Sequence, residues 1–173
     1  LRLELLAAHA QALLGLGRNN DAERLIMEAL DSDPQHYRAL LARSSLLLRR
    51  GNARDALRVT SALIERRPND TQAWNAQASS LQLLGRREDA ISAYQRALEF
   101  RAENTDARLS LVALLVQLKR WDEADVEVSY LRENYPNEPR AAYYESLVAR
   151  ERGDTEGVSQ ALAAAVNGFE TMD

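Results

Sequence analysis

The strongest constraint in this sequence is a repeat with a period of 34 residues, which alanine, glycine and proline follow at three different phases. Four of the 7 glycines share one phase, which is far more than chance would place there. A period of this length indicates an array of small helical or β units, each of which buries its apolar face only by stacking on its neighbours. The three series are Ala22, Ala56, Ala90 and Ala124; Gly17, Gly51, Gly85 and Gly153; and Pro34, Pro68 and Pro136.

Each period contains the pattern of two helices joined by a turn. Apolar residues recur at helical spacing, as in Trp74, Ala78 and Leu81. The glycine that follows is suited to the left-handed position that ends a helix, and acidic residues then open the second helix. Alanine, leucine, arginine and glutamate, all good helix formers, dominate the composition. The pattern predicts first helices at 2–15, 37–50, 71–84, 105–118 and 139–152, and second helices at 20–32, 54–66, 88–101, 122–134 and 155–169.

The period and its glycine, alanine and proline positions resemble the tetratricopeptide repeat, a helix–turn–helix unit of ~34 residues. This resemblance implies an all-α fold, an α–α superhelix (solenoid) of five helical hairpins that forms a single array with first helices on its concave side. The sequence departs from the family pattern at Ala102, where proline is expected, at Lys119, which replaces the turn glycine, and at Val158, which replaces the packing alanine. The implied repeats span 3–36, 37–70, 71–104, 105–138 and 139–172.

Composition and motifs argue against several functions. A net charge of -4 argues against nucleic acid as the main partner, and no apolar run is long enough for insertion into a membrane. Without cysteine there is no thiolate metal site, and the two histidines lack metal-ligand spacing. We expect His9 to be half-buried against its partner helix and His36 to be exposed. No phosphate loop or nucleophile turn is present, so we predict no enzyme activity, cofactor or metal.

Family members contact their ligands through fixed positions of the first helices, and the resemblance carries these positions onto a concave groove that binds a partner peptide or helix. Several of the residues there are apolar, and contiguous exposed apolar surface usually marks an interface. The Lys, Asn and Arg set with which chaperone-binding members hold a terminal carboxylate is missing, so we expect an apolar or mixed segment steered by arginines at the rim. The implied groove residues are Arg38, Leu41, Ser45, Leu48, Arg49, Gln72, Asn75, Ser79, Gln82, Asp106, Leu109, Ala113, Val116, Arg140, Tyr143, Leu147 and Arg150.

Both ends of the sequence are apolar, whereas a terminal repeat normally needs a polar cap. We expect either that the native protein continues with further repeats or another domain, or that the ends mediate self-association. The residues concerned are Leu1, Leu3, Leu5 and Leu6 at one end, and Val158, Leu162, Ala165, Val166 and Phe169 at the other.

The leading functional prediction is a protein-interaction scaffold. One alternative is a regulatory or substrate-recruiting arm of a larger enzyme. Another is a component of a bacterial envelope export or polysaccharide system, because residues 135–154 resemble exported bacterial repeat lipoproteins over about one repeat. The sequence leaves both the cytoplasm and the bacterial periplasm or envelope open as the compartment.

Overall fold

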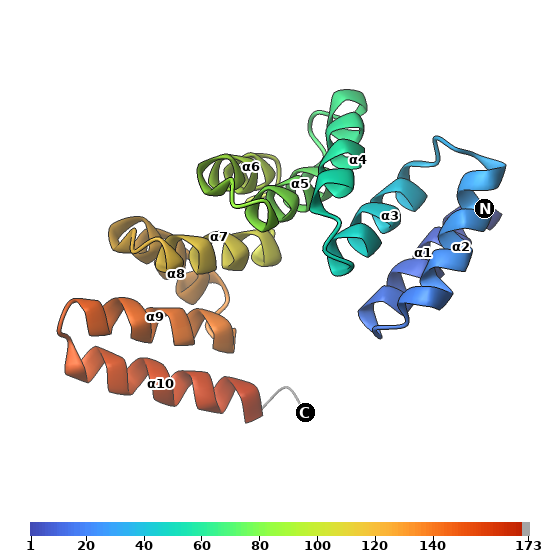
Figure 1. Cartoon of the computed structure of the whole chain (residues 1–173). Helices are drawn as coiled ribbons and strands as arrows, with labels where there is room; N and C mark the ends of the chain where they lie inside the picture. Colours follow the sequence, from blue (N-terminus) through green and yellow to red (C-terminus); the bar gives the residue numbers. More distant parts are fainter. Residues whose placement is uncertain (171–173) are drawn as a thin grey trace. The chain divides into compact units, whose positions relative to one another are not determined.

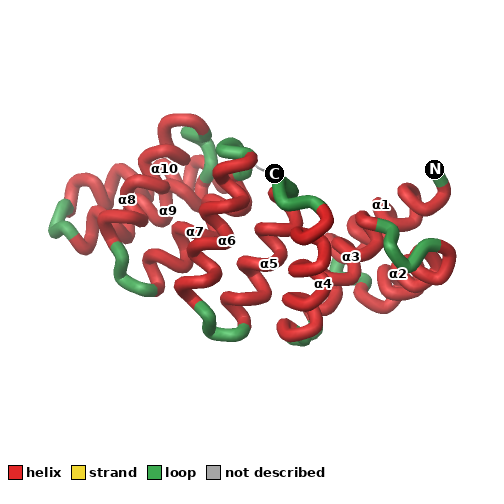
Figure 2. Tube along the Cα trace, turned by 90° about the horizontal axis from the view of Figure 1, so that it is seen from above, coloured by secondary structure: helices red, strands yellow, loops and turns green. Residues whose placement is uncertain are grey.

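The computed structural model describes residues 1–170, with side chains for residues 1–167. Within that range the chain forms ten α-helices and no strand (Figures 1 and 2). The all-α solenoid prediction is confirmed, and each predicted helix is present with both ends within one residue. The helices are α1 (Arg2–Gly15), α2 (Asn19–Ser32), α3 (Tyr37–Arg49), α4 (Ala53–Arg66), α5 (Thr71–Leu83), α6 (Arg87–Phe100), α7 (Thr105–Gln117), α8 (Trp121–Asn134), α9 (Pro139–Glu151) and α10 (Thr155–Glu170).

The turn between the two helices of a hairpin is the same in all five repeats. At Gly85, φ is 74°, and its amide donates a hydrogen bond to the carbonyl of Gln82 at 3.0 Å while Arg86 donates to Leu81 at 2.9 Å. These two bonds satisfy carbonyls that the end of α5 would otherwise leave free. Lys119 forms the same turn at φ 57°, so this geometry persists where glycine is absent.

Replacing Lys119 with glycine should stabilise the protein, because a side chain in the left-handed region costs roughly 1–2 kcal/mol. We expect Lys119→Gly to raise the free energy of unfolding by about 1 kcal/mol, and the matched Gly85→Lys to lower it by a similar amount. Urea denaturation followed by circular dichroism measures both. Equal stability of Lys119→Gly and the wild type would contradict this account of the turn.

The first helices α3, α5, α7 and α9 are capped by side chains that recur at the same 34-residue period. Asp70 Oδ1 accepts a hydrogen bond from the amide of Ala73 at 2.9 Å, and His36 and Asn104 also accept from the amide three residues on. Glu138 accepts instead from the amide of Arg140, two residues on. Such caps satisfy helix N-terminal amides that have no partner within the helix. The sequence interpretation did not include this series, which is His36, Asp70, Asn104 and Glu138.

Both histidine expectations were wrong. His36 is partly buried because its ring caps α3, and its Nε2 lies 3.3 Å from the carboxylate of Glu4. His9 is exposed because its side of α1 faces away from α2.

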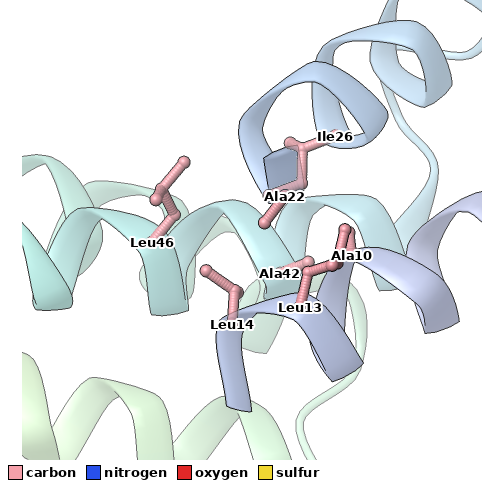
Figure 3. Packing of buried hydrophobic residues seen from close by; sticks show 7 residues of the cluster. All are labelled: Ala10, Leu13, Leu14, Ala22, Ile26, Ala42 and Leu46. Carbon is pink, nitrogen blue, oxygen red and sulfur yellow. The ribbon is translucent and has the colours of Figure 1, made fainter. Parts of the chain in front are cut away.

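The core is shared between consecutive hairpins. Figure 3 shows side chains of α1, α2 and α3 packed into one cluster, so α3 completes the core that the first hairpin begins. The alanines at the 34-residue period, such as Ala22, are fully buried at this packing. By their contacts the helices fall into two compact units, α1–α6 within Leu1–Ala102 and α7–α10 from Glu103 onward. The cluster in Figure 3 consists of Ala10, Leu13, Leu14, Ala22, Ile26, Ala42 and Leu46.

Candidate partner-binding surface

The first helices of neighbouring hairpins contact one another within each unit. Helix α1 contacts α3, α3 contacts α5, and in the second unit α7 contacts α9. Among the described residues, second helices make no comparable contact with each other. We call the side of each unit that its first helices form the inner face.

The inner face of the first unit carries an apolar strip between arginines. Leu41 and Leu48 lie two turns apart on α3 and are half-buried, and Leu83, near the end of α5, is 60% exposed. Arg38 and Arg49, near the two ends of α3, are exposed. The guanidinium Nε of Arg38 lies 3.0 Å from the carboxylate of Glu4 on α1.

Three polar residues of the predicted groove are already hydrogen-bonded inside the first unit. Ser45 Oγ donates to the carbonyl of Leu41 at 3.2 Å. The buried hydroxyl of Tyr94, on α6, donates to Gln82 Oε1 at 3.1 Å and lies 3.3 Å from Ser79 Oγ. These three side chains support the fold before any partner arrives. Tyr94 is the residue that the sequence reasoning missed, because helical spacing alone does not reveal which groups a second-helix hydroxyl reaches.

Asn75 on α5 differs from these residues. Its Oδ1 atom is buried and accepts no hydrogen bond from the described part of the chain. A buried acceptor without a partner costs roughly 1–3 kcal/mol, so most such groups in proteins are paired. The exposed side chain of Gln72 lies one turn earlier on the same helix. Because this oxygen has almost no accessible surface, a partner at the inner face does not reach it, and it adds no contact to the exposed surface.

In the second unit the prediction for Leu109 was wrong. Its side chain is only 4% exposed and packs in a cluster with Val112, Val128, Leu131 and Ala141. Helix α7 buries seven of its residues, so α8 and α9 enclose the position that the family pattern assigns to a groove. Leu109 belongs to the core and does not reach a partner.

The remaining groove residues of the second unit include one exposed aromatic ring. Tyr143 on α9 is 47% exposed, and its ring packs at 5.5 Å against Tyr144. Burial raises the pKa of the Tyr144 hydroxyl. Arg140 and Arg150 are exposed on α9, and Asp106 is exposed on α7. Ala113, Val116 and Leu147 are half-buried.

Substitutions at Leu109 and Leu41 should separate core from surface. Leu109→Ala removes fully packed atoms and should lower the free energy of unfolding by about 2–5 kcal/mol. Leu41→Ala, at a half-buried site, should cost roughly 1 kcal/mol. Denaturant titration measures both free energies of unfolding. If Leu41→Ala lowers the free energy of unfolding as much as Leu109→Ala or more, the assignment of Leu109 to the core and Leu41 to the surface is wrong.

The cap of α9 gives a pH dependence. A hydrogen bond from the Arg140 side chain, and a second from its amide, lower the pKa of the Glu138 carboxyl below 4.5. Because the folded pKa is depressed, the ionised cap stabilises the protein fully above pH 4.5, and this contribution disappears as pH falls through the lowered folded value. We expect Glu138→Gln to lower the free energy of unfolding by about 1 kcal/mol at pH 7. The difference in free energy of unfolding between this variant and the wild type should shrink toward pH 3. A difference that stays constant with pH would contradict the role of Glu138 as an ionised cap.

The described residues contain no group of three His, Asp or Glu side chains placed to hold a metal ion. In the same part of the chain, no helix has the length and apolar character needed to cross a membrane.

Comparison with known proteins identifies the repeat. The family model of the tetratricopeptide repeat matches residues 13–79 and 81–151, which is most of the chain. The chain is a tetratricopeptide-repeat protein. No curated protein sequence matches it. The family is generally a non-enzymatic interaction scaffold, and this chain has that architecture.

The solved structures of similar fold described below are identical to this chain at fewer than a fifth of the aligned residues. TTC0263, a thermophilic TPR protein of Thermus thermophilus, has 19% identity and a TM-score of 0.81, covering 96% of this chain and 91% of that one. MamA has 19% identity and a TM-score of 0.77, covering 94% and 95%. YrrB, a TPR protein with an unusual peptide-binding site, has 18% identity and a TM-score of 0.69, covering 94% and 84%. At this identity the likeness establishes the fold alone.

Proposed function

We propose that this tetratricopeptide-repeat protein binds a segment of a partner protein along the inner face of its first helices. The exposed apolar side chains of that face carry the proposal: Leu83 is 60% exposed in the first unit and Tyr143 is 47% exposed in the second. Covering them with a partner segment removes apolar surface from water, which favours association.

Both units contribute apolar side chains to this contact. Leu41, Leu48 and Leu83 offer apolar side chains on the two helices that form the inner face beside Asn75. In the second unit, Tyr143 offers an exposed aromatic ring. Tyrosine is enriched among the few residues that dominate the energy of protein interfaces, and the leucines add burial of apolar surface.

Arginines give the inner face a preference for partners with acidic flanks. Arg38 and Arg49 are exposed on α3, and Arg140 and Arg150 are exposed on α9. Charges at the rim of an interface mainly raise the association rate, and salt weakens their effect. The segment that fits is therefore apolar in its centre and acidic toward its ends. The similar structure of YrrB is described as having a peptide-binding site, which is consistent with a peptide ligand for this fold.

The test is capture by the immobilised protein, with partners from a cell lysate identified and quantified by mass spectrometry. Leu41→Glu, Leu83→Glu and Tyr143→Glu each place a charge where an apolar contact forms. We expect each to lower capture of the same partner by about tenfold, which corresponds to ~1.4 kcal/mol. Val126→Glu is the matched control, because Val126 is 67% exposed on the second helix α8, away from the inner face.

Photo-crosslinking locates the contact directly. A photoreactive residue at position 48 or 83 should crosslink to the captured partner, and one at position 126 should not. Unchanged capture by the three inner-face variants, or crosslinking only from position 126, would contradict the proposal. Thermal unfolding of each variant keeps a loss of capture distinct from a loss of folding.

A further inference from the structure

Two features of the exposed surface are not explained by the packing of the hairpins. One is the apolar set predicted at the two ends of the sequence, where Leu5 is 62% and Leu162 is 44% exposed, while Phe169 lies outside the residues with described side chains. That set carries no charge to indicate what it contacts. The other is a concentration of arginines in the second hairpin, whose charge does indicate the chemistry of a ligand.

The second hairpin carries more than half of the arginines of the first unit. Residues 37–70 contain eight arginines and three carboxylates, a net charge of +5, although the whole chain has a net charge of -4. Residues 3–36 before it have a net charge of -4, and residues 71–104 after it are neutral overall. A chain that is acidic as a whole therefore gathers positive charge on one hairpin.

Five of these arginines have partners within the first unit. Arg50 donates to both carboxylate oxygens of Glu23, at 2.6 and 2.7 Å, and Arg67 lies 3.9 Å from the centre of the Tyr37 ring. Their charge or hydrogen-bonding capacity is used by the fold. The other three contacts join Arg38 to Glu4, Arg58 to Asp55 and Arg66 to Gln35.

Arg49 and Arg54 have no such partner. Arg49 is the last residue of α3 and Arg54 is the second residue of α4, so the two lie on either side of the tight turn at Gly51. Both side chains are exposed, and neither forms an ion pair or a hydrogen bond with the described part of the chain. Two free guanidinium groups at one turn attract an anion.

This turn adjoins the apolar strip of the inner face. Arg49 follows Leu48 directly in α3. Leu83 occupies on α5 the position that Arg49 occupies on α3, and these two helices contact each other. A segment that covers Leu48 and Leu83 therefore reaches Arg49 without leaving the surface of the first unit.

We propose that the turn between α3 and α4 binds an acidic run of the partner segment, whose Asp or Glu side chains pair with Arg49 and Arg54. The inference rests on the proposed function, because the apolar part of the same segment lies along the strip while its acidic part crosses the turn. Arginine suits this role because a guanidinium group can hold a carboxylate through two parallel hydrogen bonds.

The opposite end of the strip is less suited to an acidic run. Arg38, near the start of α3, lies 3.0 Å from the carboxylate of Glu4, which offsets its charge. Gln72, near the start of α5, is exposed and neutral. The free positive charge on the inner face of the first unit is therefore at the turn end, and this places the acidic part of the segment there.

The neighbouring hairpin favours a short acidic run over a longer polyanion. Helix α2 contacts α3 and carries four carboxylates, at Asp21, Glu23, Glu28 and Asp31. A nucleic acid backbone or an anionic membrane extends its charge well beyond two arginines, so it would also meet this acidic surface and be repelled. An acidic run in a protein segment can end at the turn.

The test uses two fluorescein-labelled peptides that share an apolar core of alternating leucine and alanine. The core continues into a run of glutamates in one peptide and of glutamines in the other, and fluorescence anisotropy with the full chain measures both dissociation constants. We expect the glutamate peptide to bind about tenfold more tightly at about 50 mM NaCl and roughly twofold more tightly at about 500 mM, because salt screens exposed charge pairs. Equal affinities at low salt, or no binding of the glutamate peptide, would overturn the proposal.

Substitutions locate the preference. Arg49→Gln combined with Arg54→Gln should remove most of the preference for glutamate and leave the affinity for the glutamine peptide within about twofold. The matched control is Arg87→Gln combined with Arg101→Gln, which removes the same charge from two exposed arginines whose side chains have no partner in the described part of the chain. The control should keep the preference. A preference that survives the first pair of substitutions, or an equal loss in the control, would contradict the assignment to this turn.

Two further measurements separate this inference from the alternatives. Leu83→Gln removes an apolar contact without adding charge, so it should weaken both peptides by a similar factor and keep the glutamate preference. If Leu83→Gln leaves both affinities unchanged, the proposed inner-face contact is wrong, whereas a glutamate preference that does not depend on Arg49 and Arg54 makes the turn assignment wrong. A labelled single-stranded DNA oligonucleotide that binds more tightly than the glutamate peptide at the same salt concentration would identify a nucleic-acid site and overturn the proposal.

Discussion

In four of the five hairpins the two helices pack closely around a small side chain at the point where they cross, and in the fifth hairpin Val158 takes that position. Ala22, Ala56, Ala90 and Ala124 are all fully buried there, and a larger residue would push the helices apart. The paired helices still leave one apolar side uncovered, which the next hairpin buries, as α3 does for α1 and α2. First helices are thereby brought into contact with one another, and their remaining side forms the inner face of each unit.

The sequence predicted the helices to within one residue because each boundary depends on local chemistry. Glycine, or Lys119 in its place, ends the first helix through two backbone hydrogen bonds whatever lies around it. The site was less predictable because burial depends on neighbouring helices. Leu109 occupies a family groove position, yet α7 is apolar on most of its sides and is enclosed. Ser79 and Gln82 bond to Tyr94, a contact that no spacing rule gives.

These corrections make the proposed binding surface smaller and more specific than the predicted groove. Residues that support the fold cannot also be altered freely to suit a partner, so recognition is left to the leucines of the strip, Tyr143 and the exposed arginines.

Hydrogen–deuterium exchange of the protein with and without its captured partner tests the central claim most directly. Amide exchange reports local protection segment by segment. If the inner face binds the partner, the amides of the first helices α3 and α5, or of α9, should exchange more slowly with the partner present. Amide exchange in the second helices α4 and α8 should not change. Protection confined to the second helices would contradict the account.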